Sequence, residues 1–172
     1  FITDHSSLES QKYSRMLEGI SWGQEPVTGA EHVVALNNKV LLGNKTIHNG
    51  TMFDEAVRNS SFAFIPHPAG QGDITYDIED RAVQLMEFAG REFAMELLNG
   101  HCQLFRAWNS CSETAVGIWE KLLLNGCRIT PLGGSDAHDP FSIGTAWTGL
   151  LCNGGTHAAI ISALQDGRCF AS

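Results

Sequence analysis

The chain has 172 residues, of which 43% are hydrophobic and 17% are charged. This composition excludes a disordered or fibrous segment and predicts one globular domain over residues 1–172. The formal net charge of -8 argues against the basic surface that nucleic acids or anionic membranes would bind. We therefore expect a small-molecule substrate as partner, with no nucleic acid and no membrane.

The cysteines and the hydropathy of the chain indicate the cellular compartment in which the protein resides. The five cysteines are odd in number and show no CxxC spacing, which favours reduced thiols over a disulfide framework. No run approaches the roughly 20 apolar residues of a membrane-spanning helix, and no basic segment precedes an apolar one. These features predict a cytoplasmic protein. Because the chain begins with Phe1 rather than Met, a signal upstream stays open as an alternative.

Apolar runs typical of strands alternate with amphipathic runs typical of helices, which predicts an α/β fold. In chain order we predict a strand end at 1–3, a helix at 7–19, strands at 20–22 and 33–36, weak helical spacing at 52–57, a strand at 62–65, a helix at 77–90, a strand at 93–98, a helix at 112–126, a strand at 128–132, a helix at 156–167 and a short strand at 169–170. Asp77 and Thr156 are the predicted N-caps of two helices, and Gly90 and Gly167 are expected to end them.

The helix at 112–126 is the most clearly amphipathic of these elements. Ser112 or Thr114 is its expected N-cap, and Gly126 is its expected end. Its apolar positions fall on one predicted face, which we expect to pack against the sheet: Ala115, Ile118, Trp119, Leu122 and Leu123.

Hard metal ligands follow the predicted strands, each at or just beyond a C-terminal end. They lie in Asp4-His5, Gly23-Gln-Glu25, Pro66-His67-Pro68, Glu96 and Ser135-Asp136-Ala-His138. In barrel-like α/β folds, catalytic residues collect at that rim. Imidazole nitrogen and carboxylate oxygen together suit zinc, manganese or iron better than calcium or magnesium. The pattern predicts a divalent-metal site in which these side chains converge.

The spacing of Asp136 and His138 is the strongest single signal. Residues two apart on an extended segment project to the same side, so both side chains can reach one cluster. The alternative is a polar loop in which Ser135 and Asp136 only form a turn. The similar endings of four other strands favour the metal site.

The other candidates also have plain alternatives. Asp4 can orient the imidazole of His5 or can cap a helix. Glu25 can bridge two metal ions with its two oxygens or can be a surface residue before a proline. The prolines that flank His67 restrict its backbone, which suits a preorganised ligand.

The remaining histidines carry weaker signals. His32 precedes an apolar run and can be a ligand or a partly buried structural residue. His101 follows Asn99-Gly100 and can touch substrate, although a solvated loop residue is the simpler interpretation. We interpret His48 and His157 as surface residues.

These motifs, in this order, resemble the polymerase and histidinol phosphatase (PHP) superfamily of metal-dependent phosphoesterases. The resemblance looks strongest to its CehA/McbA-like metallohydrolase branch, and Gly-Gly-Ser-Asp136-Ala-His138 is its most specific part. It implies a distorted (β/α)7 TIM-like barrel with up to three divalent metal ions at its C-terminal rim. The family opens with a His-x-His motif on its first strand. The chain begins after that point, so we expect a domain that is truncated at its N-terminus and lacks its first strand.

The resemblance also implies a ligand set. Glu25 and Asp136 would bind a first metal ion, and Glu25 would bridge to a second ion that His67 completes. His5 and His138 would bind a third ion. Two further positions, His32 and Glu96, match recurrent positions of the family as less certain metal ligands.

The implied function is metal-dependent hydrolysis, with a phosphoester as the expected substrate and metal-activated water as the nucleophile. The sequence contains no Gly-x-Ser-x-Gly elbow, Walker loop or Rossmann fingerprint, so no protein nucleophile or nucleotide loop competes with this interpretation. The candidate catalytic residues are Asp4, His5, Glu25, Asp136 and His138. The alternative is a non-catalytic or degenerate PHP-like domain with a binding or regulatory role. Retention of the ligand-type residues argues against degeneration, and the oligomeric state is left open.

Overall fold

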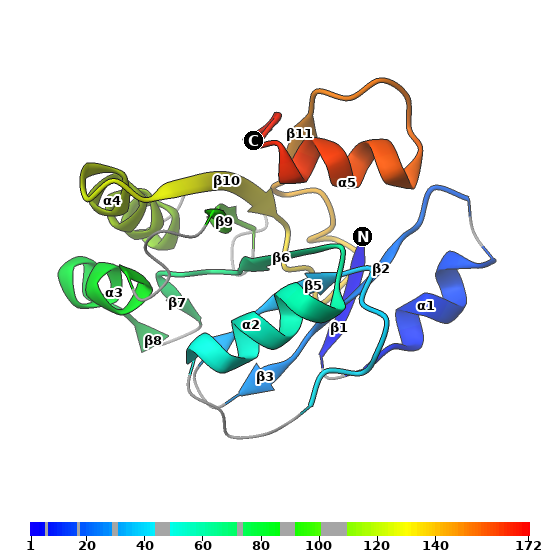
Figure 1. The fold of residues 1–172 in the computed structure, drawn as a ribbon, viewed down its shortest axis with the longest axis horizontal. Helices are drawn as coiled ribbons and strands as arrows, with labels where there is room; N and C mark the ends of the chain where they lie inside the picture. Colours follow the sequence, from blue (N-terminus) through cyan, green and yellow to red (C-terminus); the bar gives the residue numbers. More distant parts are fainter. Residues whose placement is uncertain are drawn as a thin grey trace. The chain divides into compact units, whose positions relative to one another are not determined.

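The computed structural model describes residues 1–5, 7–16, 18–28, 31–43, 49–71, 74–86, 92–100 and 110–172. Its helices and strands give a mixed α/β fold, as the sequence predicts (Figure 1). The chain divides into two compact units. Unit 1 comprises Phe1–Ile65 and Cys152–Asp166, and unit 2 comprises Pro66–Leu151 and Gly167–Ser172.

The strands of unit 1 lie in the order β1-β2-β5-β6. Their bounds are β1 Ile2–His5, β2 Trp22–Glu25, β5 Val34–Leu36 and β6 Phe62–Ile65. β1 and β2 are parallel, whereas β5 is antiparallel to both β2 and β6. A separate hairpin pairs β3 (Val27–Thr28) with β4 (Glu31–His32).

Three helices belong to unit 1: α1 (Glu9–Ser14), α2 (Asn49–Asn59) and α5 (His157–Gln165). α2 packs against β5 and β6, and α5 contacts β6. All three residues of β5 are buried, because the strand lies inside the sheet beneath α2. The core of the unit therefore forms between β5 and α2, with Met52 and Ala56 of the helix fully buried.

Two residues of β2 explain how the strand that carries Glu25 is held. At Gly23, an added Cβ would lie 2.7 Å from the Ala35 carbonyl oxygen and 2.8 Å from Cγ2 of Thr3, so only glycine permits this close strand packing. The buried Gln24 side chain accepts hydrogen bonds from Asn38 Nδ2 (3.0 Å) and the Leu42 N–H (2.9 Å). This buried network fixes β2 immediately before Glu25.

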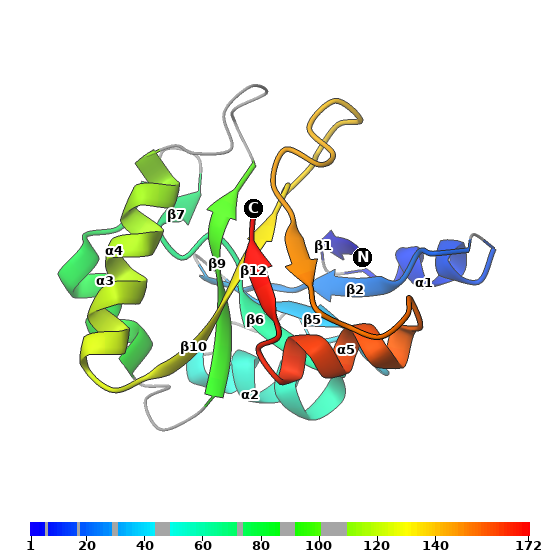
Figure 2. The same ribbon diagram turned by 90° about the horizontal axis from the view of Figure 1, so that it is seen from above.

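The main strands of unit 2 are β9 (Glu92–Asn99) and β10 (Arg128–Gly134), which pair in parallel. β11 (Thr148–Leu150) is antiparallel to β12 (Cys169–Ala171), and β7 (Gly70–Gln71) is antiparallel to β8 (Ile74–Thr75). Two helices, α3 (Ile78–Leu85) and α4 (Ser110–Leu124), pack side by side (Figure 2). α4 also packs on β9 and β10, so the core of the unit lies beneath this helix.

The packed face of α4 is mostly the face predicted from the sequence. Ala115, Ile118 and Leu122 are buried, and the partly buried Trp119 donates an Nε1–H hydrogen bond to the Ile129 carbonyl (3.2 Å). The prediction for Leu123 is wrong, because this side chain is 39% exposed. Leu123 is one residue past Leu122, a turn of about 100° that takes it off the packed stripe.

This packing gives a stability prediction. Ile118 is fully buried, and Leu124 on the same helix is 85% exposed. We expect Ile118→Val to lower the free energy of unfolding by about 0.5 to 1.5 kcal/mol, because it leaves a methyl-sized void in the core. Leu124→Ala, the control, should change it by less than about 0.5 kcal/mol. Urea denaturation measures both, and an equal loss for the two variants would contradict this packing.

The structure confirms several predicted elements and moves the bounds of others. β6 has the predicted bounds, and β9, β10 and β12 extend their predictions by one or two residues. The Asp77 carboxylate accepts from the N–H groups of Glu79 and Asp80, and Thr156 Oγ1 accepts from the Ala159 N–H, so both predicted N-caps are confirmed. α1 is shorter than predicted, β2 begins at Trp22 rather than at residue 20, and α4 begins earlier, at Ser110. The predicted end of the α3 helix at Gly90 lies outside the described residues.

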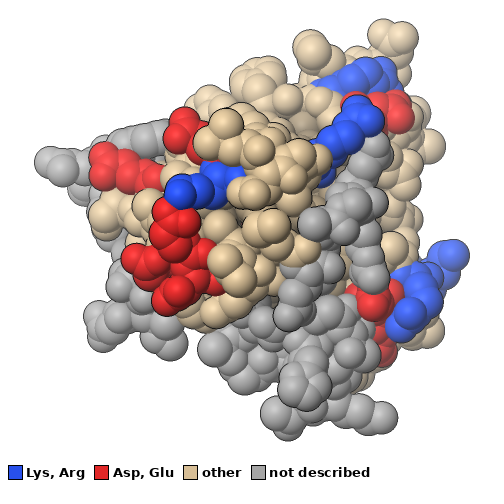
Figure 3. Space-filling model, turned by 60° about the vertical axis from the view of Figure 1, so that its left-hand side comes forward, with Lys and Arg blue, Asp and Glu red and all other residues tan. Residues whose placement is uncertain are grey.

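The helices α3 and α4 carry a charged surface. Figure 3 shows acidic side chains gathered beside basic ones on the side of unit 2 that carries α3 and α4. The Lys121 ammonium of α4 pairs with the Glu79 carboxylate of α3, an exposed pair that contributes at most about 1 kcal/mol.

Cys111, Cys127, Cys152 and Cys169 are free thiols. Within the described part of the chain, no helix combines the length and the apolar character needed to cross a bilayer.

Candidate metal centre

The pairing of β1 with β2 brings two predicted ligands together in unit 1. The strands are parallel, and their register places His5 opposite Glu25 at the C-terminal end of both. Side chains at paired positions of neighbouring strands project to the same face. The two residues, 20 positions apart in the sequence, therefore become neighbours through the register alone.

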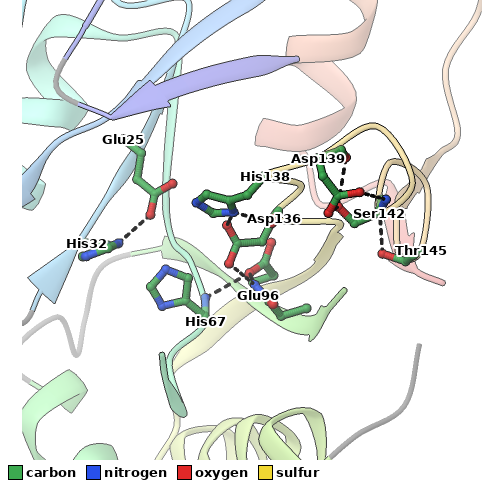
Figure 4. A network of polar contacts seen from close by, with 10 residues as sticks. Glu25, His32, His67, Glu96, Asp136, His138, Asp139, Ser142 and Thr145 are labelled. Atoms are coloured by element: carbon green, nitrogen blue, oxygen red, sulfur yellow. Dashed lines mark hydrogen bonds and ion pairs between the residues drawn. The ribbon is translucent and has the colours of Figure 1, made fainter. Parts of the chain in front are cut away.

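The β3–β4 hairpin returns His32 to the same place. Val27 pairs with His32, so the chain reverses just after Glu25. Glu25 Oε1 lies 2.6 Å from His32 Nδ1, and both side chains are at least nine-tenths buried (Figure 4). An Nδ1–H that donates to the carboxylate leaves the lone pair of the neutral imidazole on Nε2. This carboxylate–histidine pair is the arrangement that orients metal-ligating histidines.

His5, Glu25 and His32 fit a cation by geometry and by donor type. Each offers one ligand atom, and these atoms all lie within 4.8 Å of one another. Ligands of one ion with bonds of about 2.1 Å lie at most about 4 Å apart, so small side-chain rotations suffice to close on an ion. The rings of His5 and His32 meet edge to face at 5.7 Å. Two imidazoles and one carboxylate suit zinc, manganese or iron.

Asp4 makes the capping contact that was one of its two interpretations from the sequence. Its Oδ2 accepts a hydrogen bond from the Ser10 N–H (2.6 Å), within the first turn of α1. The carboxylate therefore satisfies an N–H at the start of that helix, which was the alternative interpretation of Asp4.

Unit 2 holds a second group of candidate ligands, built around Glu96. One carboxylate oxygen, Oε2, accepts from the His67 backbone N–H (3.0 Å) and from Asn99 Nδ2 (2.8 Å). Asn99 Nδ2 also donates to Asp136 Oδ2 (3.3 Å). The Asn99 amide thus connects the Glu96 carboxylate of β9 to the Asp136 carboxylate that follows β10. Glu96 and Asp136 are labelled in Figure 4.

His138 lies beside Asp136 in a defined orientation. Its Nδ1 is 2.9 Å from the Asp136 carbonyl oxygen, and an Nδ1–H donates there because a carbonyl can only accept. Nε2 then carries the lone pair that a metal ion would use. The same nitrogen, Nδ1, is 3.6 Å from Asp136 Oδ1.

Two of these residues have strained backbones. His67 has φ 27° and Asp136 has φ 47°, in the left-handed region that residues other than glycine rarely adopt. His67 also precedes Pro68, which disfavours helical conformations at that position. Such strain costs about 1 to 3 kcal/mol per residue and clusters at functional sites. The bond from the His67 N–H to Glu96 helps to hold one of these conformations.

The environment of Glu96 perturbs its ionisation. Burial raises the pKa of its carboxyl from 4.5 to about 7. The hydrogen bonds from Asn99 and from the His67 N–H lower this pKa, whereas the neighbouring charge of Asp136 raises it. A carboxyl with this pKa accepts a cation readily, since a cation offsets the cost of the buried charge.

The predicted site residues therefore form two groups. His5, Glu25 and His32 meet in unit 1, and His67, Glu96, Asp136 and His138 meet in unit 2. That all of them form a single cluster stays a prediction. His48 and His101 lie outside the described residues. The interpretation of His157 as a surface residue is wrong, because its ring stacks on Trp22 and its Nδ1 is 2.8 Å from Ser21 Oγ.

The role of Asn99 was not predicted from the sequence. Asn99 follows Glu96 by three residues, and this spacing places the two side chains on opposite faces of a regular strand. Only the local irregularity of β9 reveals the contact.

Comparisons with known proteins address the family. A family model described as PHP-associated matches residues 125–169, which include β10, the Asp136–His138 motif and α5. A crystal structure of a two-domain protein from Bacteroides vulgatus, containing a predicted PHP-like metal-dependent phosphoesterase, is similar to this chain with a TM-score of 0.61 and 21% identity. The similarity covers 94% of this chain and 47% of that protein, so this chain spans about half of its length. No curated protein matches the chain significantly.

One match compares sequence over a C-terminal segment, and the other compares the fold over most of the chain. Neither distinguishes the branches of the family, so the CehA/McbA-like branch stays a prediction. Together they confirm the resemblance of this chain to the PHP superfamily.

Proposed function

We propose that this chain is a metal-dependent hydrolase of the phosphoesterase kind, in which a single PHP-type domain forms a distorted (β/α)7 barrel. The observation that carries the proposal is the group His5, Glu25 and His32, whose ligand atoms lie within 4.8 Å of one another. The PHP-like fold and the PHP-associated segment support it. The cations that suit these ligands are zinc, manganese and iron.

When bound, divalent cations would supply an activated water and stabilise negative charge in the transition state. The residues of the chain prepare this chemistry. Glu25 orients the His32 imidazole, and the Asp136 carbonyl orients that of His138. Glu25, Glu96 and Asp136 bring carboxylate charge into buried or partly buried positions, where interactions with a cation are stronger than in water.

The substrate class follows from this proposal and from the PHP resemblance. The experiment is a hydrolysis screen in which the metal-free protein receives zinc, manganese or iron(II) in turn. A phosphomonoester, a phosphodiester and a carboxylic ester with the same chromogenic leaving group serve as substrates. We expect metal-dependent turnover of a phosphorus ester. Turnover of the carboxylic ester alone would show a hydrolase of another substrate class, and no turnover with any metal would contradict the proposal.

Metal binding gives a prediction that does not depend on the substrate. At a metal concentration of about 100 Kd, binding should raise the free energy of unfolding by about 2.7 kcal/mol. Glu25→Gln keeps the size of the side chain and one oxygen that can accept from His32, but it removes the negative charge and replaces the other oxygen with an NH2 group, which cannot bind a cation. We therefore expect this variant to lose most of the stabilisation by metal. Thermal melting with zinc or manganese, and again with a chelator, measures it.

The control is Glu120→Gln, which removes the same charge from an exposed position of α4. It should keep the full metal-dependent rise in melting temperature. If Glu25→Gln keeps that rise as well, Glu25 is not a ligand.

A further inference from the structure

A β-bulge in β9 sets the positions of Glu96 and Asn99. Leu132 pairs with Glu96 but the next residue of β10, Gly133, pairs with Leu98, so Leu97 is an extra residue in β9. Gly134 then pairs with Asn99. Glu96 and Asn99 thus lie beside positions two apart on β10, and such positions share one face. Without the bulge, side chains three apart would point to opposite faces.

The bulge lets one amide bind two carboxylates. Each hydrogen of Asn99 Nδ2 has its own acceptor, Glu96 Oε2 at 2.8 Å and Asp136 Oδ2 at 3.3 Å. The hydrogen bond to Asp136 decides the orientation of the amide, because an amide oxygen turned toward that carboxylate would be repelled. Asn99 and Glu96 are buried, at 8% and 5% exposed, so water does not compensate the loss of these bonds.

Gly134 supports the same arrangement from the opposite strand. An added Cβ at this position would overlap Glu96 Oε1. The Glu96 carboxylate therefore lies directly against the backbone of β10, two residues before Asp136. Glu96, Asn99 and Asp136 are held by this close packing and by the shared amide together.

We propose that Asn99 is a positioning residue, which holds the Glu96 and Asp136 carboxylates in the orientation in which Asp136 receives a cation. The inference rests on the proposed function. Asn99 offers both of its hydrogens to the two carboxylates, so it sets their directions before a metal ion arrives. Such preorganisation raises metal affinity without a direct bond from Asn99 to the ion.

The test measures the affinity of the chelator-treated protein for Zn²⁺ and Mn²⁺ by competition with a chromophoric chelator. Asn99→Ala should weaken binding about 10- to 100-fold, the range for partners that orient metal ligands. Gly134→Ala should weaken it in the same direction, because the added methyl group displaces Glu96. Leu122→Ala removes a buried apolar side chain of α4 and serves as the control for lost stability. Circular dichroism checks that each variant folds.

Weaker binding by Asn99→Ala and Gly134→Ala, with wild-type affinity in Leu122→Ala, supports the inference. Wild-type affinity in Asn99→Ala overturns it and leaves the proposed function intact. An equal loss in Leu122→Ala also overturns it, because the effect then follows stability. If Asn99→Ala does not fold, wild-type affinity in Gly134→Ala is the overturning result. A wild-type protein that binds neither ion contradicts the proposed function itself, and the inference fails with it.

Discussion

Asp136→Asn is expected to lower metal-dependent hydrolysis by about 10²- to 10³-fold, the range for removing a group that stabilises charge in a transition state. The substitution keeps the size of the side chain and leaves an oxygen that can accept from Asn99. Asparagine also tolerates the left-handed backbone at this position, where φ is 47°. The loss should therefore come from the missing charge and not from misfolding. Activity with added manganese or zinc, together with metal affinity, measures it.

Without metal, Asp136→Asn should not lower the stability of the protein. The Asp136 charge raises the pKa of Glu96, which shows that the two carboxylates repel each other in the absence of a cation. Asp136→Asn removes this repulsion, so melting in the presence of a chelator should change little or rise. Full metal-dependent activity in the variant would show that Asp136 is only a turn residue.

Asp77→Asn is the matched control for this pair of measurements. Asp77 is the N-cap of α3 and accepts from the N–H groups of Glu79 and Asp80. Asparagine is an equally good N-cap, so this variant removes one carboxylate from the same unit without disturbing its fold. Activity, metal affinity and melting temperature should all stay near the wild-type values.

Elements with a strong local signal could be predicted from the sequence. The apolar runs of β6 and β9 and the capping side chains of Asp77 and Thr156 depend on neighbours within a few residues. The histidine and carboxylate residues at the strand ends could also be identified from the sequence, because each follows a recognisable apolar strand. The grouping of His5 with Glu25 then needed only a parallel pairing of β1 and β2.

The remaining features could not be predicted for one of two reasons. Some depend on contacts between residues that are distant in the sequence, and others involve strands that are too short to show an alternating pattern. The two-residue strands of the β3–β4 hairpin have no alternation to detect, yet this hairpin returns His32 to Glu25. The bulge at Leu97 and the bond from Asn99 to Asp136, 37 residues away, arise only when β9 and β10 pair. For Asp4 the sequence left two interpretations open, and the hydrogen bond from the Ser10 N–H agrees with the capping one, while the catalytic role stays a prediction.

In the protein without metal, the Glu96 carboxyl should make the free energy of unfolding depend on pH. Burial raises the pKa of this carboxyl from 4.5 to about 7, so the folded protein holds the proton more tightly than the unfolded chain. Below about pH 4.5 both states are protonated and this contribution to stability is fully present. As the pH rises to about 7, the unfolded chain ionises first, and the free energy of unfolding should fall by up to about 3 kcal/mol.

Glu96→Gln should remove this pH dependence, because an amide does not ionise in the range. The measurement is urea denaturation of the chelator-treated protein at intervals between pH 4.5 and 8, with Glu120→Gln as the exposed control. The free energy of unfolding of wild type and of Glu120→Gln should fall by similar amounts as the pH rises. That of Glu96→Gln should change less. If the difference in stability between wild type and Glu96→Gln does not change with pH, the pKa of the Glu96 carboxyl is the same in the folded protein as in the unfolded chain. Its burial against Gly134 would then not perturb it, and the preorganised carboxylate pair would lose its electrostatic basis.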